Sequence, residues 1–245
     1  MYSERFYRAW VSGGELTRFR VVLFESDLEI AADYDLSGRA CAELTRLRDQ
    51  LKRYIALRRE FLTSMTPVEI EGDHPAVIEK MLGAARRWQV GPMAAVAGAV
   101  AEEVACSLSK HTGSVIVENG GDIFALAPGR IEFGLFAGGR SPFSGVLGFS
   151  AEAGDGIGVC TSSGTLGHST SFGNADAVTV ISDSGSLSDA AATALANRIH
   201  SPSDLQEQVS RAYKMDSVQG VIACCGGQLA AAGVELFRTD GREEA

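Results

Sequence analysis

The chain has 245 residues, 45% of them hydrophobic, which is enough to bury the core of one large domain or of two tightly joined subdomains. Its 31 acidic residues outnumber its 22 basic ones, and the formal net charge is −9. This excess disfavours nucleic acid as a partner, because nucleic-acid binding needs a positive surface that displaces counterions. The five cysteines contain no CxxC pair and are odd in number, so they favour neither a disulfide framework nor a zinc site.

The N-terminal stretch MYSERFYRAW lacks the apolar segment that a secretory signal requires. The longest apolar stretch, GPMAAVAGAVAEEVA, is short and is interrupted by Glu102 and Glu103, so we expect it not to span a bilayer. The sequence therefore predicts a cytoplasmic protein with no membrane partner.

The first half of the chain combines an alternating apolar pattern with long stretches of helical periodicity. These patterns predict a β-hairpin of residues 16–24 and 28–34 around a turn at 25–27, then helices over 38–65, 76–88 and 92–110. Pro92 stands near the start of the last helix, where proline is favoured.

Short apolar strands dominate the second half. The patterns predict strands over 114–118, 122–127, 131–138, 145–150 and 177–182, helices over 187–199 and 203–213, and a closing hairpin of VQGVIAC and QLAAAGVELF. Hairpins outnumber strand–helix–strand units, so we expect an α+β fold with a mostly antiparallel sheet and packed helices. No long linker divides the chain, which favours a single domain over residues 1–245.

An Asn-Gly-Gly-Asp segment joins two apolar strands in VENGGDIF (117–124). By itself this pattern is typical of a β-hairpin turn. A functional interpretation is that the two glycines let a ligand approach the backbone, while Asn119 and Asp122 supply polar contacts. The local sequence leaves both interpretations open.

Small residues open the helix that begins in GPMAAVAGAV (91–100). Close packing against a neighbouring helix would explain them. The functional interpretation is close approach of a phosphate to the positive end of the helix.

The segment SGSLSDAAATALANRI (184–199) carries two oxygen ligands on one predicted helix face. Asp189 and Thr193 are four residues apart, so their side chains lie one above the other. Such hard oxygens suit Mg²⁺ when water and phosphate supply the remaining ligands. The competing interpretation is a capping box, with Ser186 as the N-cap and Asp189 at the third helical position.

Residues 160–173 read CTSSGTLGHSTSFG and combine seven hydroxyl side chains and three glycines with His168. The composition is typical of neither a buried strand nor a helix, so we expect a loop. A solvated loop is the simpler interpretation. Alternatively, the hydroxyls and exposed amides bind phosphate, and His168 serves as an acid or base near neutral pH. Cys160 lies at the edge and is expected to pack rather than to act as a nucleophile.

The order of these motifs resembles that of ApbE-type FAD:protein FMN transferases. The family's A-I-A-K-G, N-x-G-G-D-I, T-S-G and A-D-A-L-A-T motifs match, in this order, segments between Gly91 and Asn197. A shorter sister group of ApbE-like proteins is similar over nearly the whole chain, since its pattern includes VGPMAAVAG, VENGGDI, CTSSGT-x-GHS-x-SFG and ADAAAT. The resemblance implies an ApbE-like fold and a Mg²⁺-dependent nucleotide site.

Carried over residue by residue, the resemblance implies three sets of site residues. The metal ligands would be the backbone carbonyl of Ala94 and the side chains of Asp189 and Thr193. The nucleotide would contact Asn119, Gly120, Gly121 and Asp122, and its phosphates would contact Thr161, Ser162, Ser163 and Gly164. His168 would be the catalytic acid or base. The implied cofactor is Mg²⁺, and the implied substrate is FAD or another nucleotide.

Two departures from the family pattern bear on the reaction. The lysine of A-I-A-K-G is Ala97 here, and the family's H-x-x-D-P segment is reduced to HSTSFG. Three functions therefore stay open: transfer of FMN from FAD to a Thr or Ser of an acceptor protein, Mg²⁺-dependent cleavage or transfer from another phosphorylated small molecule, and non-catalytic binding of a nucleotide or metabolite. The sequence is compatible with a homo-oligomer.

Overall fold

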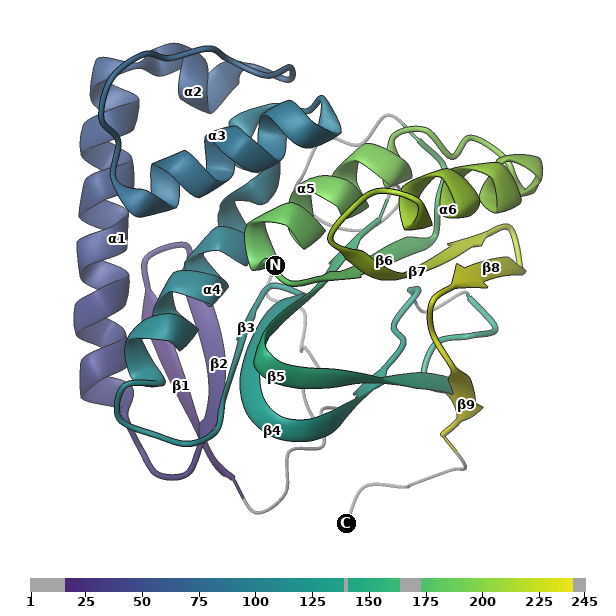
Figure 1. Cartoon of the computed structure of the whole chain (residues 1–245), viewed down its shortest axis with the longest axis horizontal. Helices are drawn as coiled ribbons and strands as arrows, with labels where there is room; N and C mark the ends of the chain where they lie inside the picture. Colours follow the sequence, from purple (N-terminus) through teal and green to yellow (C-terminus); the bar gives the residue numbers. More distant parts are fainter. Residues whose placement is uncertain (1–15, 139–140, 164–172, 240–245) are drawn as a thin grey trace.

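The computed structural model describes residues 16–138, 141–163 and 173–239 (Figure 1). Within these residues nine strands form one sheet, in which β1 to β8 follow one another in chain order and β9 pairs with β5. The strands are β1 (Thr17–Leu23), β2 (Ser26–Ala32), β3 (Val115–Asn119), β4 (Asp122–Gly134), β5 (Leu147–Ser162), β6 (Ala177–Ser182), β7 (Val218–Cys225), β8 (Gln228–Ala232) and β9 (Leu236–Arg238). All the pairs are antiparallel, which confirms the expected α+β fold.

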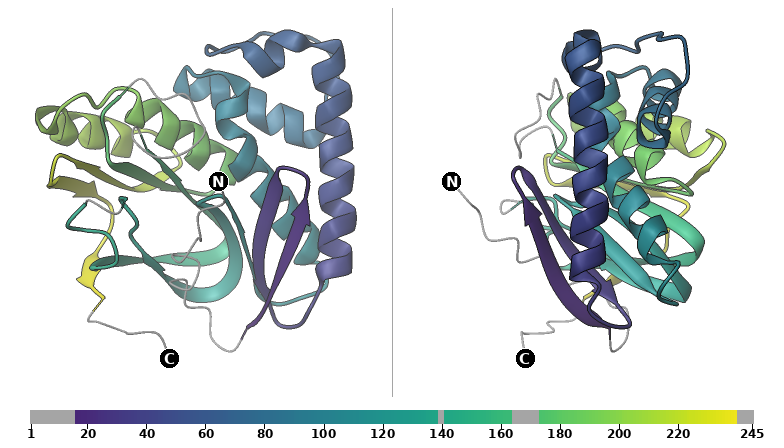
Figure 2. Two further views of the ribbon diagram at one scale, coloured as in Figure 1. Left: turned by 180° about the vertical axis from the view of Figure 1, so that it is seen from behind. Right: turned by 90° about the vertical axis from the view of Figure 1, so that its left-hand side faces the viewer.

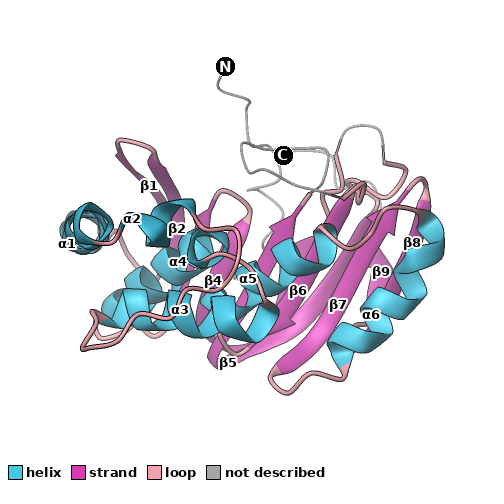
Figure 3. Ribbon diagram, turned by 90° about the horizontal axis from the view of Figure 1, so that it is seen from above, coloured by secondary structure: helices cyan, strands magenta, loops and turns pink. Residues whose placement is uncertain are grey.

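The helices gather on one face of this sheet, as the view from above shows (Figure 3). They are α1 (Ser37–Leu57), α2 (Arg59–Thr63), α3 (Ala76–Trp88), α4 (Val96–Leu108), α5 (Gly185–Ala196) and α6 (Leu205–Tyr213), with 3₁₀ turns at Pro92–Ala95 and Pro202–Asp204. Figure 2 shows α1 standing along the β1–β2 hairpin, with which it is in contact. The start of α4 and the start of α5 lie next to each other above the middle of the sheet (Figure 1).

The sheet separates two hydrophobic clusters. On β6, Val178 and Val180 belong to the cluster that includes the helices, which we call the helix face. Ala177 and Ile181 belong to a second cluster built mostly from strand residues, which we call the far face. This split follows from the alternation of side chains along a strand. The same alternation decides which polar residues of neighbouring strands lie under the helices.

The structure corrects the expectation of a loop beginning at Cys160. Strand β5 continues to Ser162, and its last residues pair with β6. Cys160 also pairs with Asp122 of β4. Hydrogen bonding on both sides outweighs the low strand propensity of the local glycines and serines.

Other element boundaries also differ from the expected ones. The helix expected over 38–65 is broken at Arg58, whose φ of −136° and ψ of 79° are not helical. The strands expected over 122–127 and 131–138 form the single strand β4, with register shifts between Ala125 and Arg130. In the closing segment, β8 pairs with β7 but β9 pairs with β5, so the last residues leave the expected hairpin.

No single helix among the described residues is long and apolar enough to cross a membrane. The helical segments Ala76–Trp88 and Pro92–Leu108 reach that length and composition only together, and they are bent by 107°.

Candidate functional site

A row of polar residues crosses three neighbouring strands on the helix face. Asn119 of β3 pairs with Asp122 of β4, and Asp122 pairs with Cys160 of β5. Gly120 and Gly121 form the turn between the first two strands, with φ angles of 72° and 104° that favour glycine. The segment is therefore a hairpin turn that also places Asn119 opposite Asp122. The hairpin interpretation and the ligand-contact interpretation are thus compatible.

The starts of α4 and α5 connect to this row. The side chain of Asn119 donates a hydrogen bond to the Ala97 carbonyl at 3.1 Å. The Gly98 amide donates to Oδ2 of Asp189 at 3.0 Å. The Cys160 thiol donates to the Gly185 carbonyl at 3.4 Å. The hairpin, the end of β5 and the two helix starts thus meet in one region.

Asp189 does not cap its own helix, so the capping-box interpretation is wrong. The N-cap of α5 is Ser184, whose hydroxyl accepts a hydrogen bond from the Leu187 amide. Asp189 lies beyond the first turn of α5 and instead accepts from Gly98, the third residue of α4. It therefore satisfies one of the amides that the start of a helix leaves without an intrahelical partner.

The two carboxyl groups of the region favour their protonated forms. Burial, followed by the nearby Asp189 carboxylate, raises the pKa of Asp122 well above its ordinary value, against the lowering effect of the neighbouring Cys160 thiol and Thr161 amide. Burial raises the pKa of Asp189 to about 7, against hydrogen bonds from Gly98 and Ala97. Oδ1 of Asp122 is buried without a hydrogen-bond partner in the described part of the structure. Both shifts arise chiefly because burial disfavours the charged form of a carboxyl group.

The thiol of Cys160 is buried beneath α5. Burial and the neighbouring carboxylates raise the pKa of Cys160 well above its ordinary value. A thiol held in its neutral form is a poor nucleophile, which agrees with the packing role expected from the sequence.

The hydroxyl of Thr161 points away from Asp189. It shares a 2.8 Å hydrogen bond with the hydroxyl of Thr179, its partner on β6. Both residues alternate with residues of the helix face, so both side chains lie on the far face. The Thr161 hydroxyl, which the sequence predicted to contact phosphate, is therefore directed to the other side of the sheet. The Thr161 amide is the group that contacts Asp122.

The other predicted phosphate contacts lie just beyond. Ser162 ends β5 and Ser163 follows it, and both are partly buried. Gly164 and His168 lie outside the described residues.

The remaining predicted metal ligands flank the start of α4. Ala94 belongs to the 3₁₀ turn that leads into α4 and packs against α5. Thr193 is partly buried on α5, one turn after Asp189. No group of three or more His, Cys, Asp or Glu side chains within the described ranges is arranged to hold a metal ion. A cation here would need oxygen ligands from the backbone, a hydroxyl, water or a substrate.

The sequence reasoning missed a charged residue at the same helix crossing. Glu102 of α4 is buried, and its carboxylate contacts Lys80 of α3 and the first turn of α5. Its only signal in the sequence is the position of an acidic pair inside an otherwise apolar, small-residue helix.

Comparisons with known proteins agree with this architecture. The family model described as "AbpE bacteria" matches residues 8–230. A UPF0280 protein from Methanopyrus kandleri is 45% identical over 196 residues, covering 80% of this chain and 79% of the relative. Another from Methanocaldococcus jannaschii is 36% identical over 232 residues, covering 91% of this chain and 94% of the relative.

Two solved structures share the fold at low sequence identity. The apo form of the flavinyl transferase ApbE from Pseudomonas stutzeri gives a TM-score of 0.55 at 15% identity, covering 89% of this chain and 94% of that one. The flavin transferase ApbE from Vibrio cholerae gives 0.52 at 15% identity, covering 92% and 97%. The ApbE-like fold expected from the motifs is confirmed, and the chain belongs to the AbpE bacteria family.

Proposed function

We propose that this protein binds a nucleotide or another phosphorylated metabolite together with Mg²⁺, at the site between the Asn119–Asp122 hairpin and the start of α4. The observation that carries the proposal is the buried Asp122 carboxyl group, which lies near a second acid, Asp189. Among the described residues, its Oδ1 has no hydrogen-bond partner. A buried acid of this kind costs free energy unless a proton, a cation or a ligand satisfies it.

The residues present fit a magnesium ion. Mg²⁺ prefers oxygen ligands and usually keeps water and phosphate in its coordination sphere, so it does not need three acidic side chains. The Ala94 carbonyl, the Asp189 carboxylate and the Thr193 hydroxyl would hold it. When bound, Mg²⁺ would neutralise charge on a phosphate and act as a Lewis acid.

The chain's own residues would orient the nucleotide. The absence of side chains at Gly120 and Gly121 leaves the turn open, since no atom of the described residues lies within 4 Å of a Cβ built at either position. Asn119 and Asp122 would flank the ligand beside this turn. The Ser162 and Ser163 hydroxyls and Gly164 would contact phosphate oxygens, next to the Thr161 amide that Asp122 holds.

His168 would move the proton in a catalysed reaction, because its ordinary pKa lies near neutral pH. The first candidate reaction, and the one with a defined substrate and acceptor, is FMN transfer from FAD to an acceptor protein. In it a Thr or Ser hydroxyl of the acceptor attacks the FMN phosphorus, the pyrophosphate bond breaks, and AMP leaves.

A second candidate is cleavage of, or transfer from, another phosphorylated small molecule. Ala97 favours it, because the family's lysine is missing at the position whose carbonyl accepts from Asn119. Non-catalytic binding is the third candidate.

A thermal-shift panel tests whether the protein binds a phosphorylated ligand, because a bound ligand raises the melting temperature. We expect FAD, FMN, ATP or a related metabolite to raise the melting temperature in the presence of Mg²⁺ and less with EDTA. Product analysis after incubation with FAD, Mg²⁺ and a protein extract then separates the candidates. AMP with protein-bound flavin indicates FMN transfer, AMP with free FMN indicates hydrolysis, and stabilisation without products indicates a binding module. No stabilisation by any phosphorylated ligand would contradict the proposal.

A further inference from the structure

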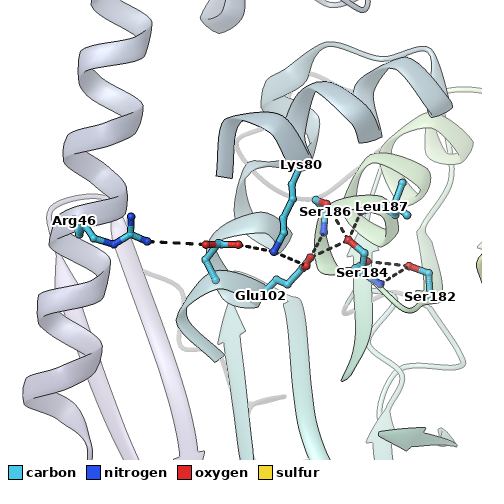
Figure 4. Close-up of polar contacts among 8 residues, drawn as sticks. Arg46, Lys80, Glu102, Ser182, Ser184, Ser186 and Leu187 are labelled. Carbon is cyan, nitrogen blue, oxygen red and sulfur yellow. Dashed lines mark hydrogen bonds and ion pairs between the residues drawn. The ribbon is translucent and has the colours of Figure 1, made fainter. Parts of the chain in front are cut away.

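The first turn of α5 is anchored by a side chain of α4. Oε2 of Glu102 accepts hydrogen bonds from the Ser184 hydroxyl at 2.8 Å and from the Ser186 amide at 3.3 Å (Figure 4). An acid at this end of a helix satisfies free amides and interacts favourably with the helix dipole. Glu102 therefore caps α5 from outside, as Asp189 caps α4.

Lys80 of α3 balances the negative charge of the buried Glu102 carboxylate. Its Nζ lies 2.9 Å from Oε1 of Glu102 and also contacts Glu103. Burial opposes the charge on Lys80, but the hydrogen bonds that its ammonium group donates to these two carboxylates outweigh the effect of burial and raise the pKa of the lysine. Oε2 of Glu103 lies 4.0 Å from the guanidinium group of Arg46 on α1.

The two caps are coupled by a close helix crossing. A Cβ built on Gly98 would lie 2.2 Å from the Gly185 carbonyl oxygen, and one built on Gly185 would lie 2.4 Å from the Gly98 carbonyl oxygen. Backbones this close leave little room for α5 to shift or rotate against α4. Asp189 follows Ser186 by three residues on the same rigid helix, so the contacts of Glu102 limit where the Asp189 carboxylate lies.

We propose that Glu102 is a positioning residue for Asp189: by holding the first turn of α5 on α4, it fixes the carboxylate of Asp189 against the Gly98 amide and towards the bound cation. The inference rests on the proposed function for its consequence in binding. The contact between Asp189 and Gly98 can be measured without any ligand. Outer contacts that orient a metal ligand commonly contribute 10–100-fold to metal affinity, so the expected effect is measurable.

The test compares Glu102→Gln with Glu103→Gln in the full chain. Both variants lose one negative charge beside Lys80, but only Glu102 contacts α5. We expect Glu102→Gln to weaken Mg²⁺ binding about 10-fold in calorimetric titration. It should also speed hydrogen exchange of the Gly98 amide in metal-free protein, with circular dichroism unchanged. Glu103→Gln should change neither. If Glu102→Gln does not fold, Ser184→Ala is tested in its place. This variant removes the 2.8 Å contact between Ser184 and Glu102, and we expect it to change Mg²⁺ binding and Gly98 exchange in the same direction.

Equal Mg²⁺ affinity and equal Gly98 exchange in Glu102→Gln and the unchanged protein would overturn the inference. Equal effects of both glutamate variants would also overturn it, since they would show a general loss of charge. If the unchanged protein binds no Mg²⁺, the proposed function fails, and Gly98 exchange alone decides whether Glu102 positions Asp189.

Discussion

The carboxylate of Asp189 accepts a hydrogen bond from the Gly98 amide at 3.0 Å, although 91 positions separate the two residues in sequence. The bond joins the start of α4 to the body of α5 above the row of Asn119, Asp122 and Cys160. A single acid therefore completes a helix start and stands beside the proposed ligand. These two roles can be tested separately. An asparagine oxygen can still accept the hydrogen bond from Gly98, but it lacks the negative charge that a metal ligand would supply.

Asp189→Asn should remove Mg²⁺-dependent ligand binding while preserving the fold. The asparagine oxygen still accepts from Gly98, so we expect the free energy of unfolding to change by about 1 kcal/mol or less at acidic pH, where Asp189 of the folded chain is protonated. The lost charge is what a magnesium ion would require. Calorimetric titration with Mg²⁺ and urea denaturation measure the two effects.

The matched control for this variant is Asp183→Asn, an identical change at an exposed position just before α5. It should leave Mg²⁺ binding unaltered. An Asp189→Asn protein that binds Mg²⁺ as tightly as the unchanged chain would contradict the assigned ligand.

The stability of the metal-free protein should depend on pH through Asp189. Its pKa is about 7 in the folded chain and 3.8 ordinarily, so between these values the folded state holds a proton that the unfolded state has released. Stability from this group is complete at low pH and is lost as pH rises towards about 7. Asp122, whose pKa is also raised, contributes in the same direction.

We therefore expect the melting temperature of the unchanged protein to fall relative to that of Asp189→Asn as pH rises through this window in EDTA. Added Mg²⁺ should reduce the fall, since a cation stabilises the ionised acid. A difference between the two proteins that stays constant with pH would argue against a protonated Asp189.

Gly98→Ala should destabilise the protein because the helix crossing has no space for a methyl group. A Cβ at this position would lie 2.2 Å from the Gly185 carbonyl oxygen and 2.8 Å from Cβ of Asp189. We expect a loss of about 1–3 kcal/mol in the free energy of unfolding, together with weaker Mg²⁺ binding. Urea denaturation checks the first and calorimetry the second.

Gly83→Ala is the comparison, because in the described part of the chain nothing lies within 4 Å of a Cβ built at that position of α3. The same substitution there should stabilise the protein by about 0.5–1 kcal/mol, since alanine favours a helix interior. Equal effects at the two glycines would refute the close crossing.

His168→Ala tests the proposed acid or base, which lies outside the described residues. The variant should slow the phosphate-transfer or cleavage reaction about 10²–10⁴-fold with little change in melting temperature. His200→Ala, at an exposed histidine, should leave the rate unchanged. The rate is measured as AMP release at saturating substrate. A smaller decrease in this rate for His168→Ala would assign His168 to binding.

The elements with strong local signals were predictable from the sequence. Helix α3 spans the residues expected from its periodicity, and β6 spans the apolar run AVTVIS. The grouping of the hairpin, the start of α4 and α5 followed from motif order, through the family resemblance. These features depend on short-range pattern or on shared ancestry, both of which a single sequence carries.

Other features depend on contacts between distant segments. The end of β5 is a strand because β4 and β6 pair with it, and the side chains of Cys160–Ser162 gave no sign of this pairing. Asp189 satisfied a capping pattern in its own helix, yet its partner is Gly98 of another helix. The role of Glu102 depends on Ser184 and Ser186 being brought to it by the fold.

The two-residue turn at Gly120 and Gly121 limits the insertions and deletions that this hairpin tolerates. Because successive residues of a strand face opposite sides, a one-residue slip of β4 against its neighbours would move Asp122 from the helix face to the far face. An insertion or deletion of one residue in this turn would thus exchange the acid for an apolar neighbour beneath α5 and bury a carboxyl group in the far-face cluster. Surface loops elsewhere accept such changes at small cost. The length of this turn is therefore part of the site, as much as any side chain that it presents.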